Sequence, residues 1–191
     1  MSENGEKYWF ALRATYGREL KAQELLKSLG IETFVPQVYQ RKRVPSKCNP
    51  NKIVERLRRT PVANLIFMFA TKQQADEILI SKHTIPYLHY RYNHLEGKGQ
   101  GYENPIIIPH HDMKRFIAIS SIDNPNIVMA NSDELRYMEN KTARVTNGIY
   151  QGLEGKVVRI KGHQRILASI GNMRWNIATG YVPTRYMEFL D

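Results

Sequence analysis

The histidines are the residues of this chain whose types suit metal binding or acid–base chemistry. His110, His111 and Asp112 are consecutive, and all three are potential metal ligands. They follow Pro109, which is typical of the first turn of a helix, where polar side chains cap and solvate the backbone. Neighbouring residues on a helix point about 100° apart, so adjacent histidines make a poor chelate. We therefore interpret this cluster as a helix start.

The other candidates for catalysis are weaker. His83, His89 and His94 lack the spacing of metal ligands. The glycine-rich piece Lys98 to Gly101 lacks the phosphate-binding pattern and a following helix, which favours a hairpin tip. Cys48 is the only cysteine, which excludes an internal disulfide and a cysteine-rich zinc site. The sequence thus predicts no enzyme, no cofactor and no bound metal.

The charge of the chain points to a polyanionic partner. There are 28 Lys and Arg residues against 18 Asp and Glu, a formal net charge of +10. Between Arg41 and Arg59 the single acid is Glu55, and Pro45 and Pro50 predict a loop in the middle. This segment is the predicted nucleic-acid surface, and the alternative is a solvated loop without a ligand. Its basic residues are Arg41, Lys42, Arg43, Lys47, Lys52, Arg56, Arg58 and Arg59.

Composition predicts a globular protein of one or two domains. The chain has 191 residues, of which 42% are hydrophobic. The polar N-terminus argues against a signal peptide, and the longest apolar run, Leu65 to Ala70, is too short to span a membrane. A single cysteine fits a reducing compartment. We expect a cytoplasmic protein with no membrane contact.

The first part of the chain predicts the element order β-α-β-β-α-β-α. Apolar or alternating runs indicate strands at residues 8–12, 32–39, 65–70 and 87–94. Gly30 is placed to end a helix that spans 18–29, and Thr71 with Gln74 forms a capping box. The inner face of the first helix should carry Ala22, Leu25, Leu26 and Leu29, and that of the third Met113, Phe116 and Ile117.

The last part of the chain has the texture of a small all-β barrel. After Lys141, short strand-like runs alternate with turns such as Asn147-Gly148 and Gly162-His163. The stretch before it is polar and predicts a linker. The expected organisation is an α/β domain at 6–122, a linker at 123–140 and a barrel at 141–191.

Two stretches of the sequence together resemble the NusG family. Trp9 to Glu19, followed by Gly30-Ile31 and Phe34-Val35-Pro36, resembles the start of the NusG N-terminal (NGN) domain. Arg144 to Val157 resembles the KOW motif, with Gly148, Gly152 and Gly155 as its recurring glycines. The resemblance implies an α+β fold: an NGN-type α/β sandwich, with an antiparallel four-stranded sheet and flanking helices, followed by a small SH3-like β-barrel.

Within the family, the chain looks most like the specialised paralogues of the RfaH and UpxY type. The likeness to UpxY rests on Thr60 to Met68. General NusG proteins tend to carry Phe-Pro-Gly-Tyr where this chain has Val62 to Leu65, and the tail Ile177 to Pro183 is also distinctive. The resemblance implies an operon-specific antitermination factor, for example for a surface-polysaccharide operon.

The resemblance also implies partners and the residues that meet them. NGN domains bind the clamp helices of RNA polymerase through an apolar face and bridge the nucleic-acid cleft. Tyr16, in a turn, is the best candidate for an exposed contact, whereas Trp9, Leu65 and Phe67 equally suit a buried core. The matching positions are Trp9, Tyr16, Gly17, Val62, Asn64, Leu65 and Phe67.

The KOW domain of the family recruits further proteins, such as a ribosomal protein, and specialised relatives can be bound by a dedicated inhibitor. We expect a monomer. Trp175 equally suits the barrel interior. The alternative function is that of a ribosome-associated RNA-binding protein with a KOW barrel, which would lack the N-terminal element order. The candidate partner surface of the KOW domain is Tyr150, Leu153, Trp175, Tyr181 and Tyr186.

Overall fold

The computed structural model describes residues 5–43, 53–82, 84–92, 104–122, 124, 126–131, 136–170, 173 and 175–190. Contacts between Cα atoms divide the chain into two compact units. The first unit comprises Met1–Pro36 and Val62–Met113, and the second comprises Gln37–Pro61 and Lys114–Asp191. This division differs from the boundaries 6–122, 123–140 and 141–191, which stay a prediction.

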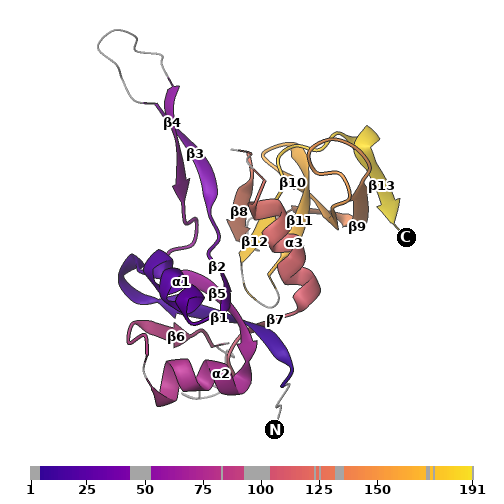
Figure 1. The fold of residues 1–191 in the computed structure, drawn as a ribbon. Coiled ribbons are helices and arrows are strands. Elements are labelled where there is room, and N and C mark those ends of the chain that lie inside the picture. The colour runs from indigo at the N-terminus through magenta and orange to yellow at the C-terminus, as the bar shows by residue number, and fades with distance from the viewer. Residues whose placement is uncertain are drawn as a thin grey trace, which may run out of the picture. The chain divides into compact units, whose positions relative to one another are not determined.

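The first unit contains an antiparallel sheet with the strand order β2-β5-β1-β6, and β7 also pairs with β1 (Figure 1). The resemblance implies four antiparallel strands, and the observed sheet has a fifth strand, the short β7. With its helices, this sheet confirms a mixed α+β fold. The strands are β1 (Lys7–Ala14), β2 (Glu32–Phe34), β5 (Leu65–Thr71), β6 (Leu88–Tyr90) and β7 (Ile107–Ile108).

The two helices of the first unit share one core with one face of the sheet. They are α1 (Glu19–Ser28) and α2 (Lys72–Asp76), the latter extended by a π turn, η2 (Glu77–Ser81). Phe10 and Leu12 alternate along β1 and are fully buried in a cluster with Ala22 and Leu26 of α1. Alternation therefore places Trp9 and Ala11 on the opposite face of the sheet.

Local signals in the sequence are confirmed in this unit. Gly30 ends α1 in a left-handed conformation, with φ 74°. Thr71 and Gln74 form both bonds of the capping box, each 3.1 Å long. The apolar stripe of α1 was predicted too wide, because Leu25 and Leu29 are 39% and 48% exposed. They lie on the flank of the face that Ala22 and Leu26 bury.

The basic segment is bounded by strands. The predicted strand 32–39 is interrupted at Val35–Gln37, since Pro36 has no N–H to offer a ladder. The chain then forms β3 (Val38–Arg43) and β4 (Ile53–Arg59), an antiparallel pair that makes its own two-stranded sheet. The predicted loop in the middle lies outside the described residues.

The third helix, α3 (His110–Ser120), begins directly after Pro109, so the His-His-Asp cluster forms its first turn as predicted. Met113 and Phe116 are fully buried, Ile119 is almost so, and Ile117 is only partly buried. Among the described residues, no helix is long and apolar enough to cross a membrane.

The second unit contains a six-stranded antiparallel sheet with the order β13-β9-β10-β11-β12-β8. Strand β8 and the first part of β9 lie within the predicted linker 123–140, because this stretch pairs with β12 and β10. Closure of this sheet into a barrel stays a prediction. The strands are β8 (Val128–Asn131), β9 (Arg136–Val145), β10 (Glu154–Ile160), β11 (His163–Ser169), β12 (Trp175–Ala178) and β13 (Met187–Leu190).

The glycines of the KOW-like motif serve two different purposes. Gly148 and Gly152 have φ values of 85° and 83°, as expected for tight turns. Gly155 does not need a positive φ. A Cβ atom there would lie 2.8 Å from Cγ2 of Ile166 and closer still to the carbonyl oxygen of Leu167. Gly155 is therefore required because β11 approaches it closely.

Candidate partner-binding surface

Strands β1 and β5 form the centre of the sheet face of the first unit that lies opposite α1. Trp9 pairs with Phe69, Ala11 with Phe67, and Arg13 with Leu65. The rings of Trp9 and Phe69 are 5.1 Å apart. Trp9, Leu65 and Phe67 are all buried, so in this structure these three candidate polymerase contacts are core residues.

The remaining candidates of the first unit meet at a corner between two turns. The backbone oxygen of Asn64 accepts a bond of 3.0 Å from the amide of Ala14. Its side-chain oxygen accepts a bond of 2.8 Å from the amide of Gly17. Val62, in the same turn, is buried. Residues about 47 positions apart in the sequence are thus joined by direct hydrogen bonds.

Tyr16 is the exposed residue of this corner. It lies in a short 3-10 turn, η1 (Thr15–Gly17), with φ 62° and ψ 31°. The left-handed region is unfavourable for a bulky aromatic residue, and such strain persists only where the surroundings hold it. The ring of Tyr16 is nevertheless 85% exposed. A strained backbone that presents an aromatic ring to solvent is a feature of binding sites.

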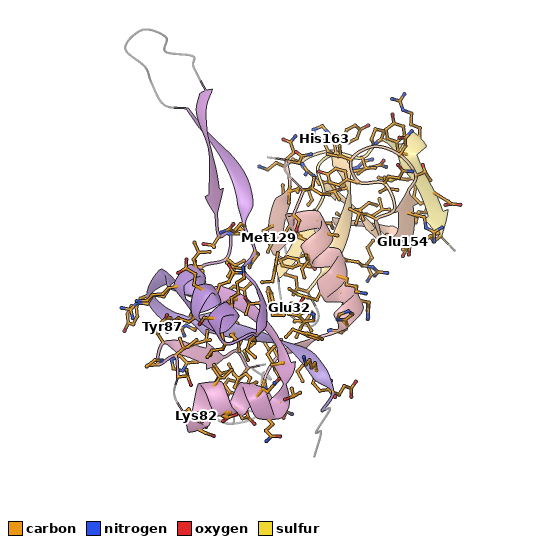
Figure 2. The ribbon with its side chains drawn as sticks, viewed as in Figure 1. Glu32, Lys82, Tyr87, Met129, Glu154 and His163 are labelled. Atoms are coloured by element: carbon orange, nitrogen blue, oxygen red, sulfur yellow. The ribbon has the colours of Figure 1, made fainter. Side chains whose placement is uncertain are left out.

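Two further residues, which the sequence did not reveal, complete the corner. The guanidinium carbon of Arg18 lies 5.6 Å from the ring centre of Tyr16 and 5.1 Å from that of Tyr87, which Figure 2 labels. The carbonyl of Tyr87 accepts a bond of 2.9 Å from the amide of Thr15. In the sequence, the only signal for Arg18 is its position two residues after Tyr16. We call Tyr16, Gly17, Arg18, Asn64 and Tyr87 the turn surface.

The basic ribbon, β3 and β4, brings several predicted nucleic-acid residues to paired backbone positions. Arg41 pairs with Arg56, and Tyr39 pairs with Arg58. Like charges at directly opposite positions are unfavourable unless an anion or solvent screens them. Lys42 and Arg43 also lie on β3, and Arg59 lies on β4. Lys47 and Lys52 lie outside the described residues.

In the second unit, Tyr150 is a structural residue and not an exposed one. It is only 5% exposed, and its hydroxyl oxygen accepts bonds of 2.7 Å from the amide of Gly180 and 2.8 Å from the side chain of Asn124. Burial raises the pKa of Tyr150 above its ordinary value. Leu153 is half-buried and packs against the hydrophobic cluster that contains Tyr150.

The other candidates of the second unit differ in exposure. Tyr181 is 56% exposed, and its ring meets the ring of His163 edge-on at 5.6 Å. The guanidinium of Arg185 lies over the half-buried ring of Tyr186. Trp175 begins β12. A hollow of about 320 Å³ is lined by Asn124, Asn126, Asn147, Gly148, Ile149, Tyr150, Tyr181, Val182, Pro183 and Tyr186.

Comparison with known proteins identifies the family. No curated protein matches the chain. Residues 7–117 match the family model described as "Transcription termination factor nusG". This match covers more than half of the chain and includes the sheet, its helices and the turn surface. The chain therefore belongs to the NusG family.

Proposed function

We propose that this NusG-family chain is an operon-specific antitermination factor. Family membership makes it a transcription elongation or antitermination factor that binds RNA polymerase, and not an enzyme. The match of residues 7–117 is the observation that carries the family role. The specialised role is inferred from the segment Thr60 to Met68, where the chain departs from general NusG proteins and resembles the UpxY and RfaH type.

The geometry of Asn64 supports this interpretation of the segment. Asn64 stands where general members carry the glycine of Phe-Pro-Gly-Tyr. Its φ of 62° lies in the left-handed region, which glycine adopts freely and asparagine tolerates better than other residues. The departure therefore keeps the backbone of the turn while it adds a side chain that binds Gly17. The surface chemistry of the turn changes and its fold does not.

In the proposed mechanism, the turn surface contacts the clamp helices of the polymerase. Tyr16 provides an aromatic anchor, and aromatic anchors dominate many protein interfaces. Trp9, Leu65 and Phe67 support the turn surface indirectly, because their burial stabilises the strands from which its turns extend. The factor bridges the nucleic-acid cleft and suppresses pausing and termination. It does so by holding a conformation of the polymerase, without covalent chemistry.

The rest of the molecule serves additional contacts in this proposal. The basic ribbon binds phosphates of DNA or nascent RNA without reading sequence. The KOW region at 141–191 closes into a small SH3-like barrel and recruits a protein, such as a ribosomal protein or a dedicated inhibitor. The factor works as a monomer in the cytoplasm, where transcription takes place, and the operon that it serves encodes surface polysaccharide.

Transcript mapping after deletion of the gene tests the specialised role. We expect loss of promoter-distal reads in one long operon, with transcripts elsewhere unchanged. Broad changes across many operons would indicate a general elongation factor. Unchanged transcripts, together with rRNA and no polymerase in a pull-down, would favour the alternative of a ribosome-associated RNA-binding protein.

A further inference from the structure

Two arginines lie diagonally on the sheet face that carries Trp9. Arg13 of β1 pairs with His89 of β6. The amide of Arg91 donates a bond of 2.9 Å to the carbonyl of Ala11, so Arg91 lies opposite Ala11, two positions from Arg13 along β1. Diagonal neighbours of an antiparallel pair are about 7 Å apart, within reach of long side chains. The two guanidinium groups therefore share one patch.

The guanidinium of Arg91 has little compensation for its burial. Its side chain is partly buried, and its Nε atom is buried without a hydrogen-bond partner among the described residues. A long contact of 3.4 Å joins its Nη2 to the carbonyl of Ala63. Burial and, secondly, the charge of Arg13 lower the pKa of Arg91. A desolvated cation beside a second cation is unfavourable, which suggests that an anion normally compensates them.

The patch is open and contains no internal anion within the described part of the chain. Arg13 is exposed, and neither arginine forms an ion pair with a described Asp or Glu. On this face Arg13 is flanked by the exposed His89 of β6 and the buried Leu65 of β5, and Ala11 pairs with the buried Phe67. Ala63, which Arg91 contacts, belongs to the turn that carries Asn64.

We propose that Arg13 and Arg91 bind a carboxylate side chain, Asp or Glu, of RNA polymerase. This inference rests on the proposed function, because the patch borders the turn surface. A carboxylate matches the planar fork of a guanidinium and can accept two parallel hydrogen bonds. Arginine is also enriched in protein interfaces, whereas lysine is depleted there. The basic ribbon is the better candidate to bind phosphates of nucleic acid, because several of its successive residues are cations.

Equilibrium binding of the full-length chain to purified polymerase core, without nucleic acid, tests the proposal. We expect Arg91→Gln to weaken binding about 30-fold, the low end for loss of one partner from a buried charge pair. Arg13→Gln, which is exposed and does not threaten folding, should weaken binding about 5-fold. Arg91→Lys should fall between wild type and Arg91→Gln, because it keeps the charge without the fork. Lys21→Gln, an exposed cation of α1, is the matched control and should bind as wild type does.

A thermal melt of each variant separates binding from folding. Because Arg91 is poorly compensated in the free protein, we expect Arg91→Gln to melt at or above the temperature of the wild type. If the arginine variants bind the core as tightly as wild type, the carboxylate site is wrong and the proposed function stands. If they lose affinity only for a nucleic-acid scaffold, the patch is a phosphate site and the proposal is also wrong. If the wild type itself does not bind the core, both proposals fail.

Discussion

Tyr16 is the residue at which the backbone and the proposed function are most closely connected. Asparagine tolerates the left-handed conformation, so Tyr16→Asn removes the ring and preserves the turn. We expect the affinity for polymerase core to fall by about 2 kcal/mol, the value typical of an interface anchor, with little change in stability. Tyr181→Asn, an exposed tyrosine of the second unit, should not affect this affinity. Equal affinities of wild type and Tyr16→Asn would remove Tyr16 from the contact.

Asn64 makes two separable contributions to the turn surface. Asn64→Ala loses the bond to Gly17 and forces alanine into the left-handed region, so it should lower the free energy of unfolding by about 2 kcal/mol. Asn64→Gly loses only the bond and should cost about 1 kcal/mol. Urea unfolding measures both values. If the alanine variant is no less stable than the glycine variant, backbone conformation is not what selects the residue here.

Tyr150 links the stability of the second unit to pH. Tyr150→Phe leaves the buried amide of Gly180 without an acceptor and should cost about 1–3 kcal/mol of unfolding free energy. The raised pKa means that the folded protein holds the phenolic proton more tightly than the unfolded chain does. Stability from this group is therefore complete below about pH 10 and is lost as the pH rises through the folded pKa.

Urea unfolding at several pH values measures this loss. The wild type should lose stability above about pH 10 more steeply than Tyr150→Phe does. The exposed Tyr181→Phe is the matched control and should behave as the wild type does at every pH. Parallel curves for the wild type and Tyr150→Phe would show that the buried phenol is not the titrating group.

At the scale of elements, the charge of the basic ribbon can be changed without changing residues of the first unit. Changing Arg56, Arg58 and Arg59 of β4 to Glu removes three cations without altering the first unit. The slope of log affinity for a nucleic-acid scaffold against log salt should become shallower by about 3, since each phosphate contact contributes about 0.9. Lys21, Lys27 and Lys114 changed to Glu form the control with equal charge. An unchanged slope for the β4 variant alone would exclude the ribbon from nucleic-acid binding.

Elements set by local chemistry were predictable from the sequence. Gly30 and the capping box of Thr71 were identified because a cap depends on a few neighbouring residues. The exposure of Leu25 depends on what packs against α1, which composition does not reveal. Strand β8 and the first part of β9 form by pairing with distant partners, in a stretch where the sequence predicted a linker.

At the scale of the whole molecule, the same contrast holds for the candidate site. The resemblance pointed to Tyr16, Gly17 and Asn64 as candidates, because family members share the turns at these positions. In the structure, a hydrogen bond joins Gly17 to Asn64. It also assigned Trp9, Leu65 and Phe67 to a contact face, where the structure buries them. The alternation of strand residues could not decide this, since both faces of β5 are apolar. Arg13 and Arg91 were missed because each is an ordinary strand-associated charge until pairing brings them together.

The net charge of +10 is a property of the whole chain that strengthens any encounter with a polyanionic assembly. It does not by itself distinguish the transcription complex from the ribosome. The distinction comes from the turn surface and its proposed protein partner. Binding to polymerase core in the absence of nucleic acid is therefore more informative than binding to a complete elongation complex, where electrostatic attraction adds to every contact.

Polymerase binding is measured by size-exclusion chromatography of the purified full-length chain with its host's RNA polymerase core. We expect the chain to elute with the core at one copy per polymerase at physiological salt. A smaller fraction of the Tyr16→Asn variant should elute with the core. Elution of the wild-type chain entirely apart from the core, with or without a nucleic-acid scaffold, would show that the chain does not bind the polymerase.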